Sequence, residues 1–259
     1  MSSILGQDLT PKTNSPFSFR SSIQNEKLNL DLPFTEHVEE LRQRSFHILA
    51  FFGLFFLVAF VEIKPIVQAL EIPVANIRFF QLSPGEYFIE TVKIALYTGV
   101  ILVSPVLLSQ ITFFVIPGLT SSEKKLILPL LLGSVSLFFI SIFFSYFFLI
   151  PAALQFFINY SSDVIEPLWS FSQYCDFILV LFTTTGIAFQ IPIFQVIIGI
   201  LGVVSGSQML KLWKYVVLLA VIFGAILTPS TDPITQILLS SAIIILYFLG
   251  AGILLLLKR

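Results

Sequence analysis

The sequence predicts an all-α integral membrane protein with six membrane-spanning helices, and three observations support this prediction. Hydrophobic residues make up 56% of the 259 residues and charged residues only 11%, against about 25% charged in an ordinary soluble domain. Six apolar runs approach the roughly 20 residues that a helix needs to cross the hydrocarbon core. The basic residues gather on the segments of one membrane side. A soluble fold of this length could not bury so much apolar surface.

The six runs are separated by segments rich in Pro, Gly and charged residues, which mark turns and interfaces. Ser104-Pro105 lies inside the second run, where a proline favours a kink. The third run ends at Pro151, and the fifth is short for a full crossing. We expect a flexible polar tail over residues 1–33 and a single membrane domain over residues 34–259. The expected spans cover about residues 46–62, 89–116, 126–150, 171–200, 212–227 and 234–257.

The distribution of Lys and Arg predicts the orientation of these spans. Six spans place both termini on the same side of the membrane. Eleven of the 14 basic residues then lie on the terminal side, and three, Lys64, Arg78 and Lys93, lie on the far side. Because cytoplasmic segments carry the excess of basic residues, both termini are expected in the cytoplasm or stroma.

Composition and motif content argue against several function classes. The formal net charge of −1 offers no basic surface for nucleic acid. Cys175 is the single cysteine, which excludes an internal disulfide and a thiolate metal cluster. The sequence has no P-loop, dinucleotide-binding glycine motif, HExxH or GxSxG. We therefore expect no enzymatic activity, no cofactor and no metal site.

Two charged clusters flank membrane spans on the terminal side. The first, residues 34–44, carries Glu40 and Arg44 four residues apart, a spacing at which they can pair on one helix face. The second, residues 117–125, carries Glu123 at the expected start of the third helix. One interpretation is structural, with an amphipathic juxtamembrane helix and a capped helix start. The alternative is that Glu40 and Glu123 bind guanidinium groups of a partner in bidentate fashion.

Polar residues within or beside the spans allow structural and functional interpretations. Gln190 lies deep in the fourth span, where it could hydrogen-bond another helix or face a groove. Glu90 and Lys93 are three residues apart and could pair locally. Asp232, between two prolines, is expected as a turn residue or as the N-cap of the sixth helix.

Five motifs in chain order resemble the signatures of the TatC family, and together they cover nearly all of the chain after about residue 33. Any one of them alone would be weak, but five in order within six spans are a specific signal. The motifs are E-H-V-E-E-L-R-Q-R at 36–44, S-P-V at 104–106 with Gln110, F-F-V-I-P-G-L at 113–119 followed by Glu123-Lys124-Lys125, F-Q-I-P at 189–192, and L-T-P at 227–229 with Asp232-Pro233 and Gln236.

The resemblance implies a receptor for signal peptides that carry two consecutive arginines on folded cargo. It assigns peptide binding to Glu40 and Glu123, with Arg42, Arg44 and Lys124 in the same set. A lysine in the peptide would lose the planar fork with which arginine binds a carboxylate. The implied partners are TatA-type and TatB-type single-span subunits, further TatC copies and membrane lipid, and the proton gradient would drive transport.

The resemblance also implies a concave six-helix bundle with Gln190 facing the groove. Gln190 stands where many bacterial members carry Glu, so it cannot supply a charge there. Asp232 belongs to a far-side turn, T-P-S-T-D, that is one residue longer than the common T-P-P-D and resembles cyanobacterial and plastid members. Together with the richness in Phe, Ile and Leu, this turn favours a plastid thylakoid membrane over a cyanobacterial or other bacterial inner membrane.

Three alternatives remain at the level of sequence. A small-solute secondary transporter would be expected to show internal repeats and paired ionisable residues at mid-membrane. A membrane-embedded enzyme would need a nucleophile with a base in reach. An Oxa-type insertase would also bind signal-like helices, but without a preference for two arginines.

Overall fold

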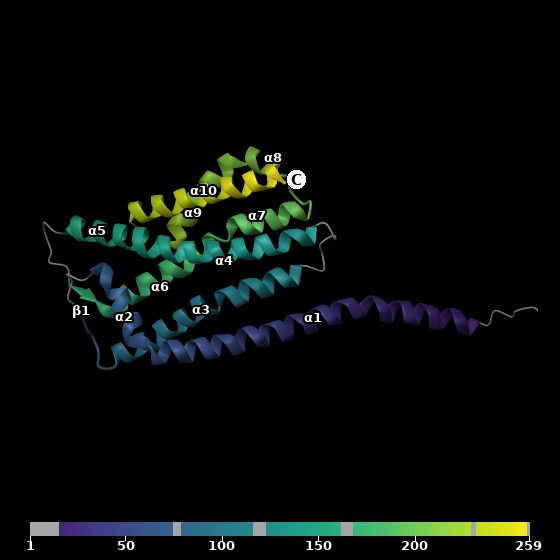
Figure 1. Cartoon of the computed structure of the whole chain (residues 1–259), viewed down its shortest axis with the longest axis horizontal. Helices are drawn as coiled ribbons and strands as arrows, with labels where there is room; N and C mark the ends of the chain where they lie inside the picture. Colours follow the sequence, from purple (N-terminus) through teal and green to yellow (C-terminus); the bar gives the residue numbers. More distant parts are fainter. Residues whose placement is uncertain (1–15, 75–78, 116–122, 162–167, 229–231, 258–259) are drawn as a thin grey trace, which may run out of the picture. The chain divides into compact units, whose positions relative to one another are not determined.

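The computed structural model describes residues 16–74, 79–115, 123–161, 168–228 and 232–257 (Figure 1). The chain divides into two compact units, Met1–His47 and Ile48–Arg259, and helix α1 (Pro16–Val61) contributes residues to both. Its first part, residues 16–33, falls in the segment that was predicted to be the polar tail. That the tail is flexible stays a prediction.

The described residues of the second unit form helices joined by turns, together with one short strand pairing. Strands β1 (Phe79–Phe80) and β2 (Trp169–Ser170) run parallel, with Phe79 opposite Trp169. The helices that follow α1 are α2 (Ile63–Glu71), η1 (Ile72–Val74), α3 (Glu86–Val115), η3 (Glu123–Leu126), α4 (Ile127–Phe144), η4 (Ser145–Leu149), α5 (Ile150–Ser161), α6 (Phe171–Ala188), α7 (Ile191–Ile200), α8 (Gly206–Lys211), α9 (Trp213–Leu227) and α10 (Pro233–Leu256).

The helices confirm the predicted all-α membrane fold. A sixth, apolar helix, Trp213–Ile226, is shorter than the other five, in line with the short fifth run of the sequence. The side of the membrane on which the termini lie stays a prediction. The described residues hold five helices long and apolar enough to cross a membrane: Val38–Val61, Glu86–Phe114, Ile127–Ser161, Phe171–Ile200 and Pro233–Leu256.

The third span extends beyond the end that the sequence predicted. Helices α4, η4 and α5 are continuous to Ser161, whereas Pro151 was expected to end the span. The turn that precedes Pro151 is a π-helix, in which the Ile150 N–H donates to the Ser145 carbonyl five residues back. Because this wider turn has already left the i→i−4 pattern, we infer that the proline ring is accommodated and the helix continues.

The proline inside α3 is accommodated differently. Pro105 has no N–H and cannot donate to the carbonyl of Ile101, four residues back. The hydroxyl of Ser104 donates to that carbonyl at 2.7 Å. The Ser-Pro pair therefore provides its own substitute donor, which allows α3 to run from Glu86 to Val115 with the proline inside it.

Helices α6 and α7 form the most enclosed of the five long spans. The most apolar stretch of Phe171–Ile200 is 56% buried, against 11% for that of Ile127–Ser161. Ile178 and Leu181 of α6 lie in a core with Ile94 of α3 and Leu239 of α10. Polar side chains on this central span must therefore find partners within the protein, because lipid offers none.

Candidate functional site

The charged segment before the first span places Glu40 and Arg44 in direct contact. The Arg44 guanidinium donates to Glu40 Oε1 from Nη2 at 2.5 Å and from Nε at 3.1 Å. The side chains are 22% exposed for Arg44 and 33% for Glu40. The predicted i, i+4 pair is thus confirmed, and its order, with the acid N-terminal to the base, is the favourable one on a helix.

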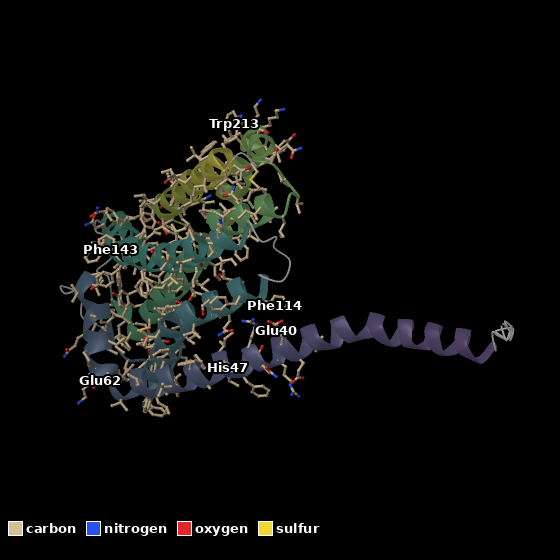
Figure 2. The ribbon with its side chains drawn as sticks, turned by 45° about the vertical axis from the view of Figure 1, so that its right-hand side comes forward. Glu40, His47, Glu62, Phe114, Phe143 and Trp213 are labelled. Carbon is tan, nitrogen blue, oxygen red and sulfur yellow. The ribbon has the colours of Figure 1, made fainter. Side chains whose placement is uncertain are left out.

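The neighbouring residues on α1 form the same kind of local contact. Arg42 Nη2 donates to Glu39 Oε1 at 2.6 Å, and this pair is more exposed than the first. The ring of His47 lies 2.7 Å from the Gln43 carbonyl, and Figure 2 shows Glu40 and His47 on the same helix. Each charge in Glu39–Arg44 is therefore already matched by one of opposite sign within a turn.

The second predicted carboxylate lies in another part of the chain. Glu123 begins the short helix η3, directly before α4, and the side chains of Glu123 and Lys124 lie outside the described residues. Glu40 belongs to the first unit and Glu123 to the second. That Glu40, Glu123, Arg42, Arg44 and Lys124 act in one binding site stays a prediction.

Gln190 lies at the break between α6 and α7, and its amide is bonded to α4. Its Oε1 accepts from the Ser134 hydroxyl at 2.8 Å, and its Nε2 donates to the Ser134 carbonyl at 3.2 Å. Only 6% of Gln190 is exposed. The interpretation as a helix–helix hydrogen bond is confirmed, and a role in a binding groove stays a prediction.

Asp232 caps the last helix. Its Oδ2 accepts from the Thr235 backbone N–H at 2.8 Å, and the side chain is almost fully buried. The predicted N-cap of α10 is confirmed. A separate functional role of this turn stays a prediction.

The start of α3 carries a charged network that the sequence showed only in part. Lys93 Nζ lies 2.9 Å from Glu90 Oε1, which confirms the predicted pair, and 2.6 Å from Asp176 Oδ1 of α6. The Ser172 hydroxyl also donates to Glu90 Oε1 at 2.7 Å. Asp176 was missed because no local spacing links it to Lys93. Its position only a few residues inside an apolar span was the available signal.

Glu86 is a second residue of this network that was not predicted from the sequence. Its Oε2 accepts from the backbone N–H groups of Leu82 and Ser83, and its Oε1 accepts from the Ser170 hydroxyl and the Ser172 N–H. One carboxylate thereby joins the start of α3 to β2 and the start of α6. A turn motif before a helix, S-P-G-E, was the available signal.

These polar side chains join neighbouring helices and turns of the chain. In the described ranges, no group of three or more His, Cys, Asp or Glu side chains is placed to hold a metal ion. The fold defines a polytopic α-helical membrane protein. The family model for the Sec-independent protein translocase protein (TatC) matches residues 36–241. The chain belongs to the TatC family.

Relatives from plastid-bearing and cyanobacterial organisms agree with this assignment. A tatC-like protein, ycf43, of Trieres chinensis is 55% identical over 99% of this chain and 97% of its own. The Sec-independent protein translocase protein TatC of Synechocystis is 50% identical over 86% and 88%. The chloroplastic TATC of Oryza sativa is 48% identical over 85% of this chain and 62% of its own.

A solved structure has the same fold. The crystal structure of a twin-arginine translocase receptor, TatC, is 33% identical, with a TM-score of 0.74 over 86% of this chain and all of that one. The transporter and insertase alternatives are not favoured by these similarities. The chain is an integral membrane protein of a thylakoid or bacterial inner membrane.

Proposed function

We propose that this chain is the receptor subunit of a twin-arginine protein translocase, which binds the signal peptides of folded proteins at the membrane. The observation that carries the proposal is the family match over residues 36–241, together with the shared fold of a solved twin-arginine translocase receptor. The proposal assigns no catalytic reaction to the chain. The chain would recognise the signal peptide and assemble the export complex.

Recognition would rest on Glu40 and Glu123. A carboxylate offers two coplanar acceptors, and a guanidinium offers a planar fork of donors, so an arginine can make two charge-assisted bonds to one carboxylate. A lysine ammonium is a compact point charge and forms no fork. This difference in geometry would explain a requirement for arginine. Arg42, Arg44 and Lys124 would border the site.

Partners and membrane follow as further parts of the proposal. TatA-type and TatB-type single-span subunits, other copies of the chain and membrane lipid would assemble around it, and the transmembrane proton gradient would drive transport. The chloroplastic and cyanobacterial relatives support a location in the thylakoid membrane.

Photocrosslinking in native membranes tests the proposal. A photoreactive twin-arginine signal peptide and its Lys-Lys counterpart would be compared on the wild type, Glu40→Ala and Glu123→Ala. We expect crosslinks that require both arginines of the peptide and whose yield falls in either variant. The binding free energy of the peptide should fall by about 1–3 kcal/mol in each variant, which is the value of a lost charge-assisted hydrogen bond.

Glu39→Ala is the matched control for Glu40→Ala. It removes the same charge from the adjacent residue of the same helix, where the carboxylate is the more exposed and is bonded to Arg42. Equal crosslinking of the two peptides by the wild type would refute the receptor function. Normal binding by both Glu40→Ala and Glu123→Ala would place the site elsewhere.

A further inference from the structure

The carboxylate assigned to the signal peptide already holds a guanidinium in the chain itself. Arg44 donates two hydrogen bonds to Glu40 Oε1, from Nη2 and from Nε. Both residues lie on α1 one turn apart. The chemical group that Glu40 would recognise in a peptide is thus the same group that it contacts within the receptor.

We propose that Arg44 is an internal occupant of the Glu40 carboxylate, and that a twin-arginine peptide binds by displacing it. The inference rests on the proposed receptor function and adds a regulatory contact to that site. It also assigns Arg44 a role different from the direct peptide contact that the family resemblance implies.

The geometry shows why the two guanidinium groups compete. An incoming arginine that binds in a fork uses both oxygens of the carboxylate, and Arg44 already directs two hydrogen bonds to one of them, Oε1. Oε1 would have to accept from three donors if both groups stayed. Two guanidinium groups at one carboxylate would also repel each other. Binding of the peptide in a fork therefore requires Arg44 to withdraw.

The burial of the pair makes this displacement feasible. The side chains of Arg44 and Glu40 are 22% and 33% exposed. The pair is therefore less exposed to water than the Glu39–Arg42 pair, but water still reaches it. Ion pairs with such access contribute little net free energy. An arginine in the peptide can gain more than the pair loses, whereas an ammonium gains a single point contact and would leave the pair in place.

The experiment is a double-mutant cycle on the full chain in lipid nanodiscs. Binding of a fluorescent twin-arginine peptide is measured by anisotropy for the wild type, Arg44→Gln, Glu40→Gln and the double variant. We expect Arg44→Gln to bind about two- to fivefold tighter, which corresponds to the free energy of a partly exposed ion pair. In the Glu40→Gln background the same change should have no effect, because there is no carboxylate left to occupy.

Arg44→Lys and Gln43→Ala complete the set. Arg44→Lys keeps the positive charge but loses the fork, so it should tighten binding less than Arg44→Gln does. Gln43→Ala changes the adjacent uncharged side chain and should match the wild type. Helicity measured by circular dichroism checks that α1 is unchanged in each variant.

Three results would overturn the inference. Weaker binding by Arg44→Gln would mean that Arg44 contacts the peptide directly. If Arg44→Gln also tightens binding in the Glu40→Gln background, and the effect fades with salt, Arg44 acts only by long-range repulsion of the peptide. If Arg44→Gln leaves binding unchanged, the Glu40–Arg44 pair does not compete with the peptide. A wild type that binds Arg-Arg and Lys-Lys peptides equally would instead refute the receptor function itself.

Discussion

Replacement of Gln190 by leucine should destabilise the second unit through one identified contact. The side chains are similar in size, but leucine removes both bonds to Ser134, at 2.8 Å and 3.2 Å. A side-chain hydrogen bond between membrane helices contributes about 0.6 kcal/mol on average and up to about 1.7. Two such bonds predict a loss of about 1–3 kcal/mol in the free energy of unfolding.

Reversible unfolding in bicelles measures this loss for Gln190→Leu. The same measurement on Ser134→Ala and on the double variant gives the coupling energy of the bond between the two side chains. We expect the two single changes to be non-additive by about 0.6 kcal/mol and by up to about 1.7, because the only bond that both of them remove is the one between the two side chains. After Ser134→Ala the side-chain amide of Gln190 can still donate to the backbone carbonyl of residue 134. That variant should therefore lose less stability than Gln190→Leu.

Gln195→Leu is the matched control on the same span. Gln195 is as buried as Gln190, but its Nε2 lies 3.4 Å from the Tyr247 carbonyl and its Oε1 has no hydrogen-bond partner among the described residues. Removing a poorly satisfied buried amide should be neutral or stabilising. Equal effects of the two leucine variants, or zero coupling between positions 190 and 134, would refute the reasoning.

Three further predictions concern the same unit. Lys93→Met should lower the free energy of unfolding by about 3–5 kcal/mol, because it leaves the buried Glu90 carboxylate without its cation; wild-type stability in chemical denaturation would contradict this. Gly199→Ala should cost about 1–3 kcal/mol, because its Cβ would overlap a buried leucine of α10. Gly252→Ala meets open space inside α10 and should be neutral or stabilising by up to about 1 kcal/mol; equal melting temperatures of the two variants would argue against this difference. Asp232→Ala should cost about 0.5–2 kcal/mol through loss of the α10 N-cap while peptide binding is retained; a binding defect in an otherwise folded Asp232→Ala variant would refute the separation of this turn from the recognition site.

Local spacing allowed several contacts to be predicted from the sequence. Glu40 and Arg44 are four residues apart, Glu90 and Lys93 three apart, and Asp232 stands directly before a helix that begins with proline. In each case both partners lie on one helix or one turn, where helical geometry fixes their distance. The apolar runs predicted the spans in the same way, because a membrane demands a minimum length of each helix.

The end of the third span shows where such local rules fail. Pro151 is a helix breaker in an α-helical register, and no pattern of residues indicates that the preceding turn is π-helical. The wider turn changes which carbonyls need donors, so the same proline no longer interrupts the ladder.

The amino-acid sequence was sufficient to predict the membrane class, the number and order of the apolar helices, the family resemblance and the charge pairs within a helix. The packing of the helices was needed to show that Lys93 also pairs with Asp176, that Glu86 joins three segments, and that Gln190 is hydrogen-bonded to Ser134. These partners are more than 50 residues apart, and their meeting depends on how helices pack. Within a membrane a polar group must find a partner, but its identity is set by which helix lies beside it.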